Sequence, residues 1–174
     1  MGRTPVGEQV EGQCVVVTAG ASGIGRAMVD AFLEAGARVH VADLPGHGAD
    51  LPDGVGFTGG DVSRPADVDR LFDDASASLG SVDVLCNNVG SAGPTVPIEE
   101  GDGDMWDETM AVNVRSMFRC CRRVAPPLRA AGGGVILHTS STAGVVRRPL
   151  RPPHAAPDCA VHRLAPRSED RRGA

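Results

Sequence analysis

The stretch that decides the fold is Thr18-Ala-Gly-Ala-Ser-Gly-Ile-Gly25, a glycine-rich turn near the start of the chain. The β-branched run QCVVVT at 13–18 precedes it and predicts a buried strand. Apolar residues at helical spacing follow over 25–35. Glycines allow a sharp turn and a close approach of an anion to the backbone, and the helix N-terminus offers free N–H groups. The unit therefore predicts a pyrophosphate site, with a plain strand-to-helix turn as the alternative.

The rest of the chain continues this alternation of strands and helices. Strands are predicted at 38–42, 55–58, 82–86 and 135–140, a helix begins at Pro65, and a long helix covers 105–129. Pro126 and Pro127 are expected to disrupt the end of that long helix. Alternating strands and helices imply βαβ crossovers. We therefore expect an α/β fold, a Rossmann-like doubly wound parallel sheet of about five strands in the order 3-2-1-4-5.

Asp43 ends the second predicted strand, 18 residues after Gly25. A carboxylate there can accept hydrogen bonds from the hydroxyls of an adenosine ribose, and it would repel a 2′-phosphate. The sequence therefore favours NAD over NADP, with a solvated acid at a strand end as the alternative. The residues of the loop expected to contact NAD are Thr18, Gly20, Ser22, Gly23, Ile24 and Gly25.

Composition and charge narrow the classes of function. The 174 residues suffice for one domain with a core, and the net charge of −5 argues against a nucleic-acid partner. No apolar run is long enough for a membrane span, and no secretory signal is expected at the N-terminus. The five cysteines form no CxxC pair and are interpreted as reduced thiols. We expect a cytoplasmic protein that holds no metal.

Two features of the composition concern chemistry and domain organisation. The sequence contains no Tyr, and its 17 basic residues are all Arg. Residues 145–174 contain seven Arg and five Pro and carry a formal charge of +4, against −9 for residues 1–144. We therefore predict a nucleotide-binding domain over 1–144 and an Arg/Pro-rich tail over 145–174.

Several motifs together resemble the short-chain dehydrogenase/reductase family. The family motif TGxxxGIG matches 18–25, except that Ala19 stands at the first Gly, where a positive φ would strain it. Asp61-Val62 resembles the family's adenine-contacting Asp and its neighbour, and Asn87-Asn88-Val89-Gly90 resembles its NNAG motif. The resemblance implies that these further residues hold NAD: Asp61, Val62, Asn88 and Gly90.

The same resemblance implies the catalytic residues. Asn113 falls at the helix Asn of the family's tetrad, and Ser141 falls at the active-site Ser. The family places a Tyr thirteen residues after that Ser and a Lys four residues later, where this chain has His154 and Asp158. An imidazole can move a proton, whereas an Asp puts negative charge where positive charge is needed. A solvent-facing helix residue and a strand-end turn residue are the alternatives for Asn113 and Ser141.

Three functions follow from these observations. The first is an NAD-dependent oxidoreductase for an alcohol or carbonyl substrate, in which Ser141 binds the substrate oxygen and Asn113 supports a proton relay. The second is a C-terminally truncated relative, with the YxxxK motif replaced, that binds NAD without turnover. The third is an interaction protein that uses the fold without a nucleotide. A hydrolase triad of Ser141, His154 and Asp158 is disfavoured because no G-x-S-x-G motif is present. The resemblance allows a homo-oligomer and does not identify the substrate.

Overall fold

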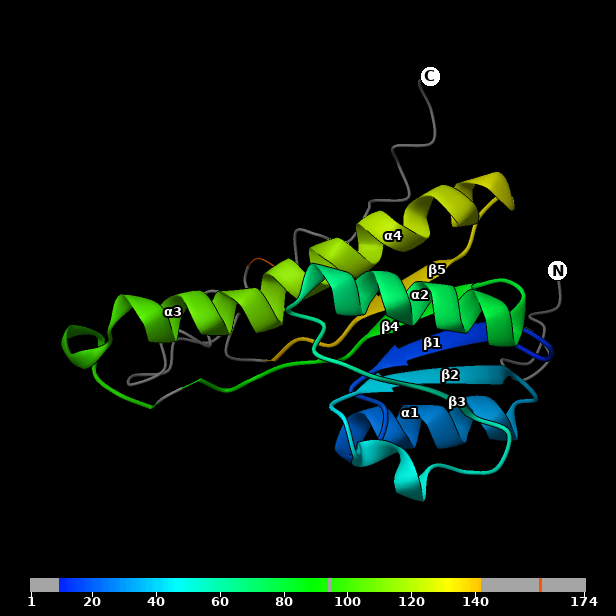
Figure 1. Cartoon of the computed structure of the whole chain (residues 1–174), viewed down its shortest axis with the longest axis horizontal. Coiled ribbons are helices and arrows are strands. Elements are labelled where there is room, and N and C mark those ends of the chain that lie inside the picture. Colours follow the sequence, from blue (N-terminus) through cyan, green and yellow to red (C-terminus); the bar gives the residue numbers. More distant parts are fainter. Residues whose placement is uncertain (1–9, 94, 142–159, 161–174) are drawn as a thin grey trace, which may run out of the picture.

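A computed structural model describes residues 10–93, 95–141 and 160 of the chain. Five parallel strands form its centre in the order β3-β2-β1-β4-β5 (Figure 1). This arrangement confirms the predicted doubly wound sheet. The strands are β1 (Cys14–Thr18), β2 (Arg38–Asp43), β3 (Gly56–Gly59), β4 (Val84–Asn87) and β5 (Val135–His138).

Helices cover both faces of the sheet. Helix α1 (Gly23–Glu34) packs on one face, and α2 (Pro65–Leu79) and α4 (Ser116–Ala130) pack on the other. The short helix α3 (Gly103–Met110) projects past the sheet in Figure 1 and continues into α4 through the π-helical turn η4 (Ala111–Arg115). Two 3-10 turns are also present, η2 (His47–Asp50) and η3 (Ile98–Glu100).

The end of α4 departs from the prediction. The helix runs through Pro126 and Pro127 to Ala130, so the expected disruption at these prolines is wrong. Both prolines lie on the exposed side of the helix, where water can bond the carbonyl groups that lack an N–H partner one turn earlier. No helix in the described ranges is both long and apolar enough to cross a lipid bilayer.

Alternate side chains of β1 enter two separate apolar layers. Val15 and Val17 are fully buried in the layer that also contains Val29 of α1. Val16 belongs to the opposite layer, where it packs with residues of α2 and α4 such as Leu71. A strand buried on both faces is what the continuous β-branched run predicts. The carboxyl ends of β1 and β4 lie side by side where the strand order reverses.

Candidate functional site

Two adjoining cavities lie at the carboxyl ends of the central strands, with volumes of about 470 and 300 Å³. Both are lined by Ala19 and by 89–91, so they form one groove. The structure brings many of the predicted site residues to this groove. The larger cavity is lined by Ser22, Ile24, Asn88, Gly90, Asn113 and Ser141, and the smaller one by Asp43, Asp61, Val62 and Gly90.

The glycine-rich turn lets α1 begin directly against β1. A Cβ atom on Gly25 would overlap the carbonyl oxygen of Ala19 and come within 2.7 Å of Asn88 Nδ2. Gly23 has a φ of +54°, which favours glycine, and nothing lies within 4 Å of the position of its missing Cβ. Ser22, the N-cap residue, makes no side-chain capping bond and lines the larger cavity. The N-terminus of α1 thus borders the larger cavity, which the side chains of Ser22 and Ile24 line.

Ala19 has the strained backbone conformation that its place in the glycine motif predicts. Its φ is +52°, and it is the one non-glycine residue with positive φ in the described part of the chain. The conformation is held on both sides, because its N–H donates to the Ala42 carbonyl and its own carbonyl accepts from Asn88 Nδ2. Left-handed backbone costs an L-residue about 1–2 kcal/mol. The surrounding hydrogen bonds therefore impose a conformation for which glycine is better suited.

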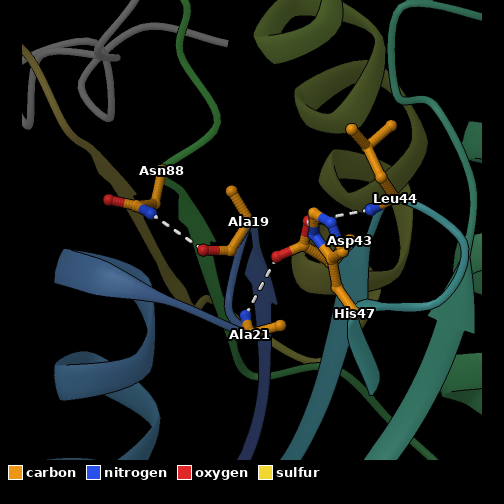
Figure 2. Close-up of polar contacts among 6 residues, drawn as sticks. All are labelled: Ala19, Ala21, Asp43, Leu44, His47 and Asn88. Atoms are coloured by element: carbon orange, nitrogen blue, oxygen red, sulfur yellow. Dashed lines mark hydrogen bonds and ion pairs between the residues drawn. The ribbon is translucent and has the colours of Figure 1, made fainter. Parts of the chain in front are cut away.

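Thr18 and Asn88 join the loops that follow β1 and β4. Thr18 is fully buried, and its Oγ1 accepts from the N–H groups of Asn88 and Val89 at 3.0 and 3.2 Å. The Asn88 Nδ2 group donates to the Ala19 carbonyl at 3.2 Å (Figure 2), and its Oδ1 accepts from Thr139 Oγ1 at 2.9 Å. Thr18 therefore positions the loop after β4 from a buried site. Asn88 lines the groove and bonds residues at the ends of β1 and β5.

Asp43 links the glycine-rich turn to the end of β2. Its Oδ2 accepts from the Ala21 N–H at 3.0 Å, and its Oδ1 accepts from the Leu44 N–H at 2.8 Å and from His47 Nδ1 at 3.1 Å (Figure 2). The side chain is only 9% exposed. Sequence reasoning missed His47, although its place four residues after Asp43 in a Pro/Gly turn was a usable signal.

Asp61 and Val62 also line the smaller cavity. Asp61 Oδ1 accepts from the Ser63 N–H at 2.9 Å, and the Asp61 N–H donates to Asp67 Oδ2. That backbone hydrogen bond holds the pKa of Asp67 below its usual range. Val62 is buried. These bonds shape the turn before α2 so that this part of the smaller cavity presents an acid beside an apolar surface.

Asn113 holds the loop after β4 against the π-helical turn η4 through two hydrogen bonds to Ser91. It lies in the π-helical turn η4, a feature frequently found at functional sites, and it is buried. Its Oδ1 accepts from the Ser91 N–H at 2.7 Å, and its Nδ2 donates to the Ser91 carbonyl at 2.8 Å. Ser141 lines the same cavity. The other two predicted catalytic residues, His154 and Asp158, lie outside the described residues.

A polar cluster between β4, α4 and β5 was not predicted from the sequence. Asn87 is 1% exposed, and its Nδ2 lies 3.5 Å from Cys121 Sγ and 3.4 Å from His138 Nδ1. Burial lowers the pKa of His138 and raises the pKa of the Cys121 thiol, so both side chains are uncharged at neutral pH. Three elements that are separate in the sequence, β4, α4 and β5, meet at these side chains.

Comparison with known proteins gives concordant matches. A family model described as short chain dehydrogenase matches residues 13–170. The chain is 37% identical over 143 residues to 3beta-hydroxysteroid dehydrogenase 2 of Eggerthella lenta, covering 77% of this chain and 55% of that protein. It is 35% identical over 146 residues to D-threitol dehydrogenase of Mycolicibacterium smegmatis, covering 79% and 56%. The chain thus spans little more than half the length of these curated relatives.

The fold also matches solved structures. A crystal structure of 3-ketoacyl-(acyl-carrier-protein) reductase from Brucella melitensis complexed with NADH superimposes with a TM-score of 0.84 and 29% sequence identity. The match covers 89% of this chain and 68% of that one.

Proposed function

The chain belongs to the short-chain dehydrogenase family, and from that membership we propose that its groove binds NAD. The observation that carries the proposal is the close contact between the glycine-rich turn and α1 at Gly25, where an added Cβ would overlap the Ala19 carbonyl. This close contact places the start of α1 beside a cavity of about 470 Å³, which Ser22 and Ile24 line. A pyrophosphate is the group that a helix N-terminus of this kind suits.

The adenosine end of the cofactor would occupy the smaller cavity. Asp43 supplies a carboxylate at its rim, beside the apolar wall formed by Val62. A carboxylate accepts hydrogen bonds from ribose hydroxyls and repels a 2′-phosphate, so we propose a preference for NAD over NADP. The similar reductase from Brucella melitensis was crystallised with NADH.

The nicotinamide end would occupy the larger cavity, beside Asn113 and Ser141. When bound, the cofactor supplies a ring carbon that exchanges a hydride with an alcohol or carbonyl carbon. Both amide atoms of Asn113 are engaged by Ser91, so Asn113 acts by positioning the loop after β4. We propose that Ser141 binds the substrate oxygen. The two curated relatives are named for a hydroxysteroid and for threitol, and an alcohol or ketone is accordingly the proposed substrate class.

We propose that this chain catalyses hydride transfer more slowly than family members that have the catalytic Tyr and Lys. In the sequence, the family's catalytic Tyr and Lys align with His154 and Asp158, by the resemblance described above. An Asp cannot lower the pKa of a neighbouring proton donor as a Lys does. We therefore propose a relative that binds NAD and transfers hydride poorly. The double substitution His154→Tyr with Asp158→Lys raises alcohol oxidation only if the rest of the pocket is intact.

The location proposed for the protein is the cytoplasm. Cys14, Cys86, Cys120 and Cys121 carry free thiols, which fits a reducing compartment.

Calorimetric titration of the 174-residue chain with NAD⁺ tests the proposal. We expect saturable binding at one site and a rise in melting temperature. Asn88→Ala removes the bonds to Ala19 and Thr139 and should weaken binding by about tenfold, whereas Ser76→Ala on α2, remote from the groove, should not. Absence of any heat and of any thermal shift would overturn the proposal and favour an interaction protein that uses the fold without a nucleotide.

A further inference from the structure

We propose that Cys121 is a reactive thiol that forms covalent adducts with α,β-unsaturated carbonyl compounds, with His138 as its base and Asn87 as the residue that orients the base. The three side chains come from α4, β5 and β4, and they line neither cavity of the groove. A reactive thiol at this place goes beyond the proposed function and does not depend on nucleotide binding.

The three side chains are arranged as a nucleophile, its base and an orienting residue. Cys121 Sγ lies 3.8 Å from His138 Nε2, and the other ring nitrogen, Nδ1, lies 3.4 Å from Asn87 Nδ2. A thiol beside one ring nitrogen and an amide beside the other is the arrangement by which an imidazole activates a cysteine. Asn87 Nδ2 also lies 3.5 Å from Cys121 Sγ, so each side chain of the cluster contacts the other two.

Asn87 provides an independent reason to assign it the orienting role. The residue is 1% exposed, and its Oδ1 has no hydrogen-bond partner among the described residues. A buried polar atom without a partner costs about 1–3 kcal/mol. A half-turn of the amide brings Oδ1 to the position of Nδ2, where it accepts the Nδ1–H of His138. Nε2 is then the unprotonated ring nitrogen, and it faces the Cys121 thiol.

The protonation states of the thiol and the imidazole suit a proton transfer between them. Burial raises the pKa of the Cys121 thiol and lowers the pKa of His138. The resting thiol therefore keeps its proton, while the neutral imidazole has a lone pair that can accept it. Since the thiolate is the nucleophile, Cys121 reacts when His138 takes the proton as the electrophile arrives.

Conjugate addition is the reaction that suits this cluster. The Sγ–C bond forms at the β-carbon of the electrophile while the carbon–carbon π bond breaks, and the thiol proton passes to His138 Nε2 and then to the α-carbon. The step needs no oxidant or reductant. Acyl transfer would also need N–H donors for an oxyanion, whereas the backbone N–H groups around Cys121 are bonded within α4.

Access to Cys121 allows a direct labelling experiment. Cys14, Cys86 and Cys120 are buried, whereas Cys121 is partly exposed. Cys159 lies outside the described residues, so the Cys159→Ser variant serves as the parent protein. Intact-protein mass spectrometry at pH 7 follows its reaction with acrylamide, a small α,β-unsaturated amide. We expect a single adduct at early times that disappears when Cys121→Ser is added. Equally fast labelling without Cys121 overturns the inference.

Two histidine substitutions in this parent test the base. His138→Gln should slow adduct formation about a hundredfold, because it removes the proton acceptor. His40→Gln is the matched change on β2, where the ring contacts Ser78 and Thr58, and it should leave the rate unchanged. If His138 only filled space, its replacement would loosen the cluster, and the rate would stay the same or rise. Either of these outcomes contradicts a role as base.

A second measurement needs no substitution in the cluster and covers the case in which His138→Gln does not fold. The rate per thiol of the folded parent is compared with the rate in guanidinium chloride, where no base is held beside Cys121. Base catalysis should make Cys121 react about tenfold faster in the folded protein, despite its partial burial. A slower reaction in the folded protein overturns the inference. Neither result bears on NAD binding, which the calorimetric titration tests separately.

Discussion

The β1–α1–β2 region and the outer strand β5 belong to one sheet but differ in how completely they are packed. Val15, Val84 and Val135 lie in one row across β1, β4 and β5, and their exposed fractions are 0%, 3% and 49%. Helix α1 covers the first end of this row, while the matching face of β5 is open among the described residues. The difference teaches that the groove proposed to bind a nucleotide is built mainly on the well-packed region. Ser141, the residue proposed to bind the substrate oxygen, follows the less enclosed strand.

The strongest way to break the packed region is to add one carbon at Gly25. Gly25→Ala should lower the free energy of unfolding by about 3 kcal/mol, because its Cβ overlaps the Ala19 carbonyl and reaches Asn88. NAD binding should weaken by more than about tenfold. Urea unfolding and calorimetric titration provide the two readouts. The matched control is Gly103→Ala in the first turn of α3, where nothing lies within 4 Å; an equal loss in both variants would contradict the assigned crowding.

The packing difference along the row of valines can be measured directly. Val15→Ala should lower the free energy of unfolding by about 2 kcal/mol, since it leaves a cavity in a closed apolar layer. Val135→Ala, the same chemical change on β5, should cost less than about 0.5 kcal/mol. Urea unfolding of the two variants gives both numbers. Similar costs would show that β5 is covered as completely as β1.

A substitution at Ala19 should stabilise the protein, in contrast to those at Gly25 and Val15. Ala19→Gly should raise the free energy of unfolding by about 1 kcal/mol, because glycine adopts a φ of +52° without strain. Ala35, the C-cap of α1, has a φ of −84°, so Ala35→Gly should destabilise the protein slightly. Thermal unfolding distinguishes the two signs. A loss of stability in Ala19→Gly would mean that the methyl group contributes more through packing than it costs through strain.

The smallest expected effect is a pH dependence of the free energy of unfolding, due to His40 on β2 and His138 on β5. Burial lowers the pKa of His40, whose ring nitrogens lie 2.8 Å from Ser78 Oγ and 2.9 Å from Thr58 Oγ1, despite the opposing charge of Asp74. On acidification the unfolded chain binds a proton before the folded protein does. The free energy of unfolding should therefore fall as the pH drops below about 6.5.

Substitutions separate the two histidines. His40→Gln should flatten the pH dependence of urea unfolding between pH 7 and 5. His138→Gln on β5 should flatten it less, since that side chain is less buried. A steeper dependence in His40→Gln than in wild type would contradict the assignment.

Much of the fold could be predicted because its signals are local. The β-branched runs, the helical spacing after Gly25 and the turn glycines depend on neighbouring residues, and they led to the observed strand order. The same local reasoning was wrong at Pro126 and Pro127, because their effect on α4 depends on which side of the helix faces water. Local propensity is therefore reliable for elements and less so for their ends.

The sequence by itself determined the alternation of strands and helices, the sharp turn before α1 and the identity of the acids at the groove. These follow from backbone freedom at glycine and from side-chain periodicity, which consecutive residues specify. Only the tertiary structure decided how those groups are engaged. Thr18 bonds the backbone of Asn88 across 70 positions, and Asn113 holds Ser91 from a different element. His47 contacts Asp43 only because η2 folds back over the end of β2. Such contacts depend on strand order and register, which bring distant residues together and which no short stretch of sequence encodes.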